Sequence, residues 1–501
     1  MSSPAEAGLR PPRSVAAAVG RVRQADSIWW LVIVAAAFTI AQLALVVPKL
    51  GLSWDETVYI SQVSSHAPAS YFDPARARGI PLLVAPLTLL TSSVLALRIY
   101  LSLASGLGLF LALLTWRRLR PAWQLALAGV LFGGLWTTLY YGPQAMPDLW
   151  VALSSLAAVG FFLQAARADG ISARHRWGAL AGLTVCGAFA ALVRPGDALY
   201  LAAVLGIAVL AVRQWRRWDL LAAVVTGFAA GAAEWVIEAY VSFGGPLNRL
   251  HEAGAEQGGF GFHLAFWDEL RAVNGPTLCR PCTVGYRYPV LSLWWLALPV
   301  LVVLGVIAAR RAGRLAPAAL AAVCAFGLAF QYLFLINYAA PRFLLPAYAL
   351  AAIPVAEAVG WLVTSVRSEL RPPVITLVGV VLLVQLLVQA AALQHQVQEK
   401  ISFLGDYTRI AADLRTLGVR PPCLIKGDQD IPIAFYAGCA SAPAVTTSGT
   451  AVGGSSTEPV AVLVAPGQQP PAYARDWTQH ELPGIQSKLL EMSVYLPPGR
   501  G

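Results

Sequence analysis

Two adjacent carboxylates, Asp55 and Glu56, follow the first long apolar run of this 501-residue chain. A carboxylate that is partly removed from water can accept a proton from a hydroxyl group, and an adjacent pair can also hold a cation. The other interpretation is a solvated loop in which Asp55 caps a short helix containing Val58 and Tyr59. The residues alone leave both interpretations open. They also leave open whether the pair binds a divalent cation.

Three further charged residues stand where later apolar runs begin. Asp148 opens one run, Arg194 starts an Arg-Pro-Gly-Asp turn that ends at Asp197, and Arg342 lies in a Pro-Arg-Phe segment. Each guanidinium could bind a phosphate group in two-pronged fashion. The alternatives are a helix cap for Asp148, an ion pair between Arg194 and Asp197, and a contact of Arg342 with lipid headgroups.

Acidic residues recur in a later apolar run and in the loop that follows it. Glu234 and Glu238 are four residues apart, so in a helix they share one face. We expect them to line a polar cavity or to pair with one of the Arg residues. The His and Glu residues of the next, glycine-rich loop have a spacing that matches no metal site, and a solvated loop is expected there: His251, Glu252, Glu256 and His263.

The composition is that of a membrane protein, because 57% of the residues are hydrophobic and only 12% are charged. Soluble domains average roughly 25% charged residues. A net charge of +10 would suggest nucleic-acid binding in a soluble protein. Here the Arg residues gather in short clusters between apolar runs, as in cytoplasmic loops. A nucleic-acid partner is therefore not expected.

The apolar runs predict about eleven transmembrane helices, since about 20 such residues span a bilayer. A further segment, 80–91, carries Pro81 and Pro86 and is expected to lie at the outer interface. The N-terminus is expected inside and the C-terminus outside, because every inner loop then holds at least two Arg. The predicted spans are 29–48, 94–115, 122–141, 147–165, 177–193, 197–212, 219–241, 290–309, 316–337, 342–364 and 374–393.

The predicted domain organisation has three parts. Residues 1–28 form a cytoplasmic tail, residues 29–394 form an all-α membrane domain, and residues 395–501 form a small extracytoplasmic α/β domain. The last part contains strand-like runs at 423–426 and 460–464, and residues 440–458 are expected to be a flexible loop. The membrane domain carries two long outer loops, 49–93 and 242–289.

The six cysteines divide by their surroundings. Cys186 and Cys324 lie inside predicted helices and are expected to be inert packing residues. The other four lie on the oxidising face and are expected to form two disulfides, Cys279–Cys282 and Cys423–Cys439. The Cys-Arg-Pro-Cys spacing of the first pair leaves metal or redox chemistry as the alternative.

The charged candidates converge on the outer membrane face although they come from different helices. A rim of carboxylates and guanidiniums is what a transfer reaction with a phosphate leaving group needs. A transporter would instead be expected to carry polar residues at mid-membrane and paired broken helices. The converging candidates are Asp55, Glu56, Asp148, Arg194 and Arg342.

Several short motifs, in this order, resemble the GT-C superfamily of membrane glycosyltransferases. The closer likeness is to protein O-mannosyltransferases and lipid A aminoarabinose transferases, and it covers residues 29–212 best. The motifs are Asp55-Glu56 with Tyr59, Pro81-Leu82-Leu83, Arg98, Arg117-Arg118, Asp148, Arg194 and the Pro-Arg-Phe-Leu-Leu-Pro segment at 341–346.

The resemblance implies a GT-C-like fold and an enzyme that uses a polyprenyl-phosphate-linked sugar as donor. Asp55 would then act as the base or as an acceptor-positioning residue, with Glu56 and Asp148 assisting in positioning, and direct displacement with one base would invert the anomeric centre. The acceptor would be a cell-envelope glycan, lipid or protein at the outer face of the plasma membrane. The alternative function is a transporter or flippase of a lipid-linked intermediate. The residues expected to bind substrate are Arg194, Arg342, Tyr59, Glu234 and Glu238.

Overall fold

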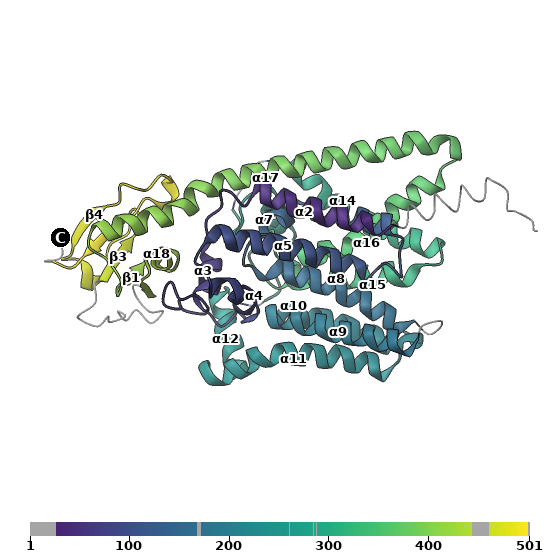
Figure 1. The fold of residues 1–501 in the computed structure, drawn as a ribbon, viewed down its shortest axis with the longest axis horizontal. Helices are drawn as coiled ribbons and strands as arrows, with labels where there is room; N and C mark the ends of the chain where they lie inside the picture. The colour runs from purple at the N-terminus through teal and green to yellow at the C-terminus, as the bar shows by residue number, and fades with distance from the viewer. Residues whose placement is uncertain are drawn as a thin grey trace, which may run out of the picture.

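The computed structural model describes residues 27–167, 172–259, 261–283, 285–286, 288–442 and 460–498. Its helices form a bundle with nearly parallel axes, and a small domain with a β-sheet lies at one end of that bundle (Figure 1). The predicted tail 1–28 falls almost entirely outside the described residues. We refer to the end of the bundle nearest the sheet as the domain end.

Eight described helices are long and apolar enough to cross a membrane, which makes this a multi-pass membrane protein. Three shorter apolar helices coincide with the remaining predicted spans, so each predicted span has a helical counterpart. The number of true crossings and their sidedness remain predictions. The long helices are α5 (Val94–Leu114), α8 (Pro147–Ala166), α9 (Ala173–Val193), α11 (Trp218–Ser242), α14 (Val290–Arg311), α15 (Leu315–Phe334), α16 (Leu345–Ser365) and α17 (Arg371–Thr416), and the shorter ones are α2 (Trp29–Leu45), α6 (Ala122–Gly133) and α10 (Pro195–Ala211).

Two predicted segments have a different local form. The predicted span 122–141 is broken after Gly133, and α7 (Trp136–Tyr141) follows α6 as a separate short helix. The side-chain oxygen of Gln389 accepts the backbone N–H of Trp136 at 2.9 Å, which satisfies a donor at the start of α7. The predicted interfacial segment 80–91 contains helix α4 (Gly79–Thr88), in which Pro86 lies inside the helix.

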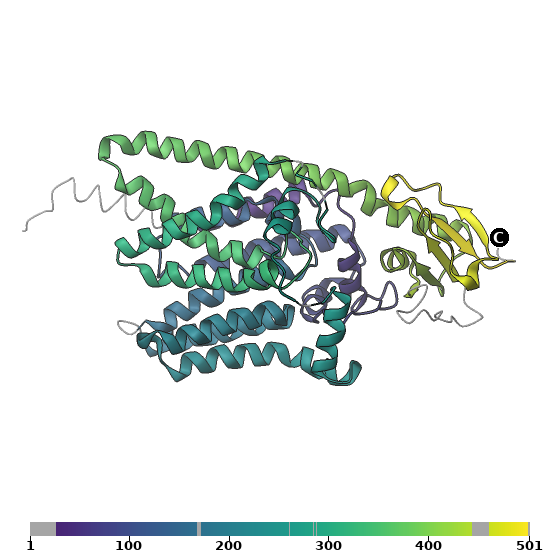
Figure 2. The same ribbon diagram turned by 180° about the vertical axis from the view of Figure 1, so that it is seen from behind.

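Helix α17 joins the bundle to the small domain without a break. It has 46 residues and is therefore about 69 Å long at 1.5 Å per residue. Its first part exposes apolar side chains such as Leu377 and Val381, while Tyr407 and Ile410 in its last part are buried against the small domain. The predicted domain boundary at 394/395 falls inside this helix. Figure 2, which views the molecule from behind, shows that α17 runs along the whole bundle.

The small domain contains a five-stranded mixed sheet in the order β2-β1-β3-β5-β4. Strand β1 pairs in parallel with β2 and β3, and β5 pairs antiparallel with β3 and β4. The prediction of a small α/β domain is confirmed, and of the predicted 440–458 loop, 440–442 form β2 and 443–458 lie outside the described residues. The elements are β1 (Leu424–Gly427), α18 (Asp430–Ala437), β2 (Ala440–Ala442), β3 (Val460–Val464), β4 (Thr478–Glu481) and β5 (Ser493–Leu496).

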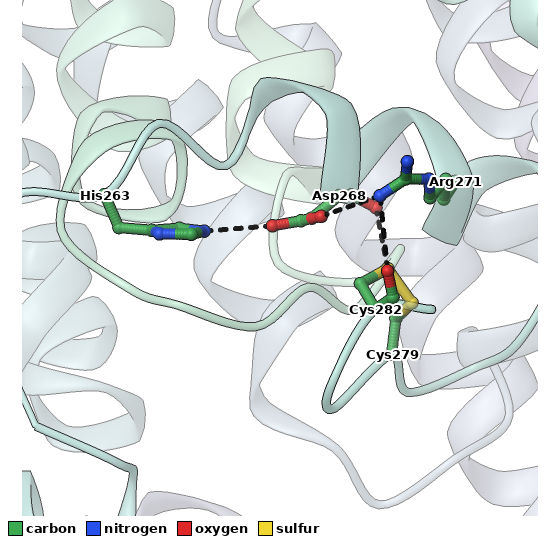
Figure 3. Close-up of a disulfide and its surroundings, with 5 residues drawn as sticks. All are labelled: His263, Asp268, Arg271, Cys279 and Cys282. Atoms are coloured by element: carbon green, nitrogen blue, oxygen red, sulfur yellow. Dashed lines mark hydrogen bonds and ion pairs between the residues drawn. A yellow bond between two sulfur atoms is a disulfide. The ribbon is translucent and has the colours of Figure 1, made fainter. Parts of the chain in front are cut away.

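Both predicted disulfides are formed, with Cα atoms 4.5 Å apart in Cys279–Cys282 and 4.8 Å apart in Cys423–Cys439. The second disulfide ties the start of β1 to the residue before β2. The first closes a tight turn close to Arg271 and Asp268, as Figure 3 shows. There the Asp268 carboxyl lies 3.0 Å from Nε2 of His263 and accepts a hydrogen bond from Arg271 at 3.3 Å. Arg271 also donates to the carbonyl oxygen of Cys282 at 3.2 Å.

Short helices lie at the domain end of the bundle, among them α3 and α12 (Figure 1). Helix α18 of the small domain packs against α3, so the small domain rests on the segment that follows α2. This arrangement places the Asp-Glu pair of α3 between the membrane helices and the sheet. The short helices are α3 (Trp54–Ser61), α12 (Pro246–Glu256) and α13 (Phe266–Asn274), and the 3-10 turns are Arg213–Trp215, Ser368–Leu370, Ala472–Ala474 and Lys488–Leu490.

Candidate active site

A cavity of about 400 Å³ lies at the domain end of the bundle. It is bounded by α3, the 71–77 loop, the start of α8, the turn between α9 and α10, and the segments around 280 and 340. Five of the eight predicted site residues line it together: Asp55, Tyr59, Asp148, Arg194 and Arg342. We call this space the charged cavity.

Asp55 is held between two guanidinium groups. Its Oδ1 lies 2.7 Å from Nη2 of Arg76, and its Oδ2 lies 3.1 Å from Nη2 of Arg342. Helix α3 begins at Trp54, so Asp55 is in the first turn of that helix. Burial raises the pKa of the Asp55 carboxyl, but the charges of Arg76 and Arg342 outweigh burial and leave the pKa below its usual value. Asp55 is therefore an ionised carboxylate at neutral pH.

Asp148 forms a second ion-pair centre on the opposite wall. Its side chain is 1% exposed and is bound by Arg194 through Oδ1, while Oδ2 lies 3.5 Å from Nε of Arg342. Arg194 also approaches Asp197 at 3.6 Å and lies over the rings of Tyr332 and Phe343. Arg342 consequently bridges the two carboxylates, Asp55 and Asp148, that the sequence places 93 positions apart.

Tyr59 lies one turn after Asp55 on α3, beneath the guanidinium of Arg76. The carbon of that guanidinium is 4.9 Å from the centre of the Tyr59 ring, a cation–π distance. Burial raises the pKa of the Tyr59 hydroxyl, so Tyr59 is a neutral donor at physiological pH. Its place in the charged cavity agrees with the predicted substrate-binding role, which stays a prediction.

Glu56 lies behind the charged cavity and does not line it. Its side chain and that of Arg98 are both fully buried, and the two form an ion pair through both carboxylate oxygens. Glu56 Oε2 also accepts the backbone N–H of Ser53 at 3.0 Å, which closes the capping box at the start of α3. Glu56 Oε1 accepts the N–H of Ala145 at 2.9 Å, so this carboxylate joins α3 to the segment before α8.

Glu234 and Glu238 also lie outside the charged cavity. Glu238 binds Arg78 through Oε1 and Arg249 at 2.8 Å through Oε2, and the N–H of Arg78 donates to Glu234 at 3.4 Å. The fully buried Arg249 in turn donates to the carbonyl oxygens of Pro74 and Arg76, each at 3.0 Å. This network fixes the backbone that carries Arg76 into the charged cavity.

The disulfide Cys279–Cys282 holds another cation of the charged cavity. Arg280, between the two cysteines, lies over the ring of Tyr338 at 5.0 Å and donates to the carbonyl oxygen of Glu256 at 2.8 Å. Backbone hydrogen bonds pair Cys279 with Ala339, three residues before Arg342. The tight turn therefore positions residues on two sides of the charged cavity, which agrees with a structural disulfide.

An apolar groove of about 970 Å³ runs between α5, α8 and α9. At one end it is lined by Trp150 and Phe189, which pack edge to face. Trp150 is two residues after Asp148 in α8, and Phe189 is one turn before Val193, which lines the charged cavity. The groove thus begins beside the charged cavity and follows the helices toward the Arg cluster at Arg117 and Arg118.

Within the described residues, no three His, Cys, Asp or Glu side chains gather as a metal ion would require. His263 instead pairs with Asp268, and Glu256 accepts the hydroxyl of Tyr71 at 3.2 Å. His251 and Glu252 lie on α12, where Glu252 accepts a hydrogen bond from Asn248 at 3.0 Å. His263, Glu252 and Glu256 are therefore each engaged with a neighbour, and these residues do not form a shared site in the described part of the chain.

No family model matches the chain, and no curated protein matches its sequence. Solved structures do match. ArnT from Cupriavidus metallidurans bound to undecaprenyl phosphate superposes with a TM-score of 0.64 at 14% identity, over 94% of this chain and 98% of ArnT. The chain has the GT-C fold.

The GT-C fold also relates the chain to archaeal oligosaccharyltransferases. AglB from Archaeoglobus fulgidus, in complex with an inhibitory peptide and a dolichol-phosphate, matches with a TM-score of 0.53 at 13% identity, over 84% of this chain and 65% of AglB. An Archaeoglobus fulgidus oligosaccharyltransferase in complex with Zn and sulfate matches with a TM-score of 0.52 at 13% identity, over 81% of this chain and 62% of that one. The predicted fold class is confirmed.

Sequence reasoning did not assign to this site four charged residues that line the charged cavity within this GT-C fold: Asp73, Arg76, Glu256 and Arg280. A signal for the two cations existed, because Arg76 and Arg280 lie in predicted outer loops, where the positive-inside rule disfavours Arg. The carboxylates carried no such signal. Among the described residues, eight charged side chains line the charged cavity, of which four are guanidiniums and four are carboxyls.

Proposed function

We propose that this chain is a membrane glycosyltransferase that moves a sugar from a polyprenyl-phosphate donor to an acceptor of the cell envelope, at the outer face of the plasma membrane. The observation that carries the proposal is Asp55 held between Arg76 and Arg342, with Arg194 in the same cavity. The carboxylate can accept the proton of the acceptor hydroxyl, and the guanidinium groups can stabilise the negative charge that develops on the phosphate. The GT-C fold shared with enzymes of this class supports it.

In the proposed step, the acceptor hydroxyl oxygen attacks the anomeric carbon of the donor sugar. The bond between that carbon and the phosphate oxygen breaks, and its electron pair stays on the phosphate. The hydroxyl proton passes to the Asp55 carboxylate. A single displacement of this kind inverts the anomeric centre. Arg194 and Arg342 neutralise the phosphate as its charge rises, since guanidinium groups bind phosphate in two-pronged fashion.

The ion pairs of Asp55 give the donor a second role in this mechanism. Although burial raises the pKa of Asp55, Arg76 and Arg342 lower it below its usual value, which makes the carboxylate a weak base. A bound donor phosphate competes with Asp55 and Asp148 for Arg342. Withdrawal of Arg342 from Asp55 raises the pKa of that carboxyl, so that donor binding strengthens the base.

The apolar groove between α5, α8 and α9 is the proposed seat of the isoprenoid chain. Its volume is about 970 Å³, and its Trp150–Phe189 end adjoins the charged cavity. An isoprenoid is wholly apolar, so burying it along a groove of apolar side chains is favourable. The phosphate of a lipid placed in this way reaches the guanidiniums without leaving the membrane interface.

The remaining predicted residues take supporting roles. Asp148 orients Arg194 and Arg342, because it binds both. Glu238 and Glu234 fix the loop of Arg76 rather than contacting substrate, and Glu56 anchors α3 through Arg98. Tyr59 supports Arg76 from below.

The competing function is that of a transporter or flippase, which would move a lipid-linked intermediate across the membrane. It is less well supported because the charged groups gather at one end of the bundle instead of along a path through it. The two functions differ in their product: an enzyme releases polyprenyl phosphate, whereas a flippase returns the intact lipid-linked sugar.

The experiment that tests the proposal is a profile of lipid-linked sugars in a deletion strain. We expect one polyprenyl-phosphate sugar to accumulate, the matching envelope sugar to disappear, and both changes to be reversed by the wild-type gene but not by Asp55→Asn. Accumulation on the inner leaflet alone, or full rescue by Asp55→Asn, would contradict an enzyme at the outer face.

A further inference from the structure

A second cavity, of about 600 Å³, lies against the sheet of the small domain. It is lined by residues at the carboxyl ends of the parallel strands: Gly427 at the end of β1 and Asp428 after it, Ala442 at the end of β2, and Val464 at the end of β3. The carboxyl ends of parallel strands are where open α/β sheets bind ligands. We call this space the sheet-edge cavity.

The sheet-edge cavity adjoins the charged cavity. Trp54, Tyr71 and Ile431 line both spaces. Trp54 immediately precedes Asp55 on α3, so the wall between the two spaces belongs to the helix that carries the proposed base. A ligand in the sheet-edge cavity can therefore extend one end past Trp54 and Tyr71 toward Asp55.

The two cavities differ in charge. Four guanidiniums line the charged cavity, whereas within the described part of the chain no Arg or Lys lines the sheet-edge cavity. Phosphate and carboxylate ligands are bound most strongly by such cations. The division fits an anionic donor in the first space and an uncharged ligand in the second.

The polar groups of the sheet-edge cavity suit hydroxyl groups. They are the carboxyls of Asp428 and Asp430, the carboxamides of Gln468 and Gln469, and the hydroxyl of Ser441. Burial raises the pKa of Asp430 to about 7, so near neutral pH this carboxyl exists in a form that donates as well as accepts. Together with the aromatic faces of Trp54 and Tyr71, these groups match the alternating polar and apolar surfaces of a sugar ring.

The backbone at this edge has a specific requirement for glycine. Gly427 has φ of 101°, and a Cβ atom there would collide with the carbonyl oxygen of Leu463 in the neighbouring strand. The turn at Gly427 directs Asp428 to the backbone N–H of Ala465, which donates to its Oδ2 at 2.9 Å. Both strand ends are thereby fixed around the sheet-edge cavity.

We propose that the sheet-edge cavity binds the acceptor, and that the acceptor is a neutral carbohydrate whose terminal hydroxyl reaches Asp55 past Trp54 and Tyr71. This inference rests on the proposed function, because it assigns an acceptor to that reaction. It selects one class among the glycan, lipid and protein acceptors that the charged cavity alone leaves open.

The first arm of the test measures binding without catalysis. Neutral oligosaccharides are released from the envelope of the deletion strain and separated from the charged fragments by ion exchange, and each pool is titrated into the full-length protein in detergent. We expect the neutral pool to bind and the charged pool not to bind. The double variant Gln468→Ala/Gln469→Ala should weaken binding by about tenfold, the loss expected for two hydrogen bonds.

Matched controls separate the site from the fold. Gln479 is an exposed glutamine on β4, outside the sheet-edge cavity, and Gln479→Ala should bind like the wild type. Ser441→Trp, which fills the cavity from β2, should abolish binding of the saccharide. Every variant should bind undecaprenyl phosphate like the wild type, as measured by the shift of the unfolding temperature.

The second arm measures transfer of radiolabelled sugar to the same neutral pool. We expect the double variant to raise KM for the acceptor about tenfold at unchanged kcat. Saccharide binding without any transfer by the wild type would contradict the proposed function and leave the saccharide site standing. Unchanged binding in both cavity variants, binding of the charged pool instead, or a protease-sensitive product would overturn the inference.

Discussion

Arg342 Nη2 lies 3.1 Å from Asp55 Oδ2, although the two residues are 287 positions apart in the chain. The same guanidinium lies 3.5 Å from Asp148 through Nε. One side chain thus joins the segment after the first apolar helix to the starts of α8 and α16. The proposed reaction depends on this bridge, because the donor phosphate must take Arg342 from Asp55 before the carboxylate can act as a base.

The pH dependence of the reaction should reflect the lowered pKa of Asp55. The base is the ionised form, so the acid limb of kcat/KM should lie below about pH 3.9, the ordinary value for Asp. The same ionisation stabilises the folded state above that pH, and this contribution is lost as pH falls through the lower pKa of the folded protein.

Arg76→Gln tests the cause of that lowered pKa. Burial raises the pKa of Asp55, and Arg76 is the largest charge that opposes it. We expect the acid limb of kcat/KM in this variant to move to higher pH. An acid limb at the wild-type position would show that Arg76 does not set the pKa of Asp55.

Arg342→Lys should lower turnover by about ten- to a hundredfold while the protein stays folded. Lysine keeps the charge but lacks the planar fork that reaches both Asp55 and Asp148. The measurement is steady-state transfer from the donor, with Arg310→Lys at the exposed end of α14 as the matched control. Equal turnover in the two variants would mean that the bridge has no catalytic role.

Glu238→Gln should destabilise the protein and also reduce turnover. It leaves the fully buried Arg249 without its carboxylate, and breaking such a pair costs about 3 kcal/mol. Because Arg249 holds the carbonyl oxygen of Arg76, the loop should shift and KM for the donor should rise. Thermal unfolding and steady-state kinetics check both effects, and Glu252→Gln on α12 serves as the control.

Glu56→Gln distinguishes an anchor from a catalytic group. The Glu56–Arg98 pair is fully buried, so its disruption should cost about 3–5 kcal/mol and reduce the yield of monodisperse protein. Protein that does fold should retain kcat within a few-fold, which is read by normalising turnover to active sites. A folded variant with normal stability and no turnover would show that Glu56 has a catalytic role.

The position of Glu56 illustrates what the sequence could and could not predict. Helix geometry alone does not decide which of the two acids faces the cavity, since the adjacent residues Trp54 and Asp55 of α3 both line it. The sequence predicted the pair and its location after the first span, but which acid faces inward depends on the contact of Glu56 with Arg98 and Ala145.

The membrane helices were predictable because apolar runs and Arg clusters are local signals. The long helix α17 extends beyond its predicted span, since hydropathy marks the membrane crossing and not the end of a helix. An Arg at position 76 was unusual for a predicted outer loop, but its place in the cavity could not be predicted, because contacts with Arg249 and Glu238 of two later helices set it. Both disulfides were predictable because their cysteines lie in segments predicted to face outside.

The most direct test of the central claim is the release of polyprenyl phosphate from a polyprenyl-phosphate sugar by the purified protein and by Asp55→Asn. The exposed Asp476→Asn in the small domain is the matched control. We predict that Asp55→Asn folds and binds undecaprenyl phosphate, but releases polyprenyl phosphate at least about a hundredfold more slowly than the wild type and Asp476→Asn. Release by Asp55→Asn at the wild-type rate would contradict Asp55 as the base.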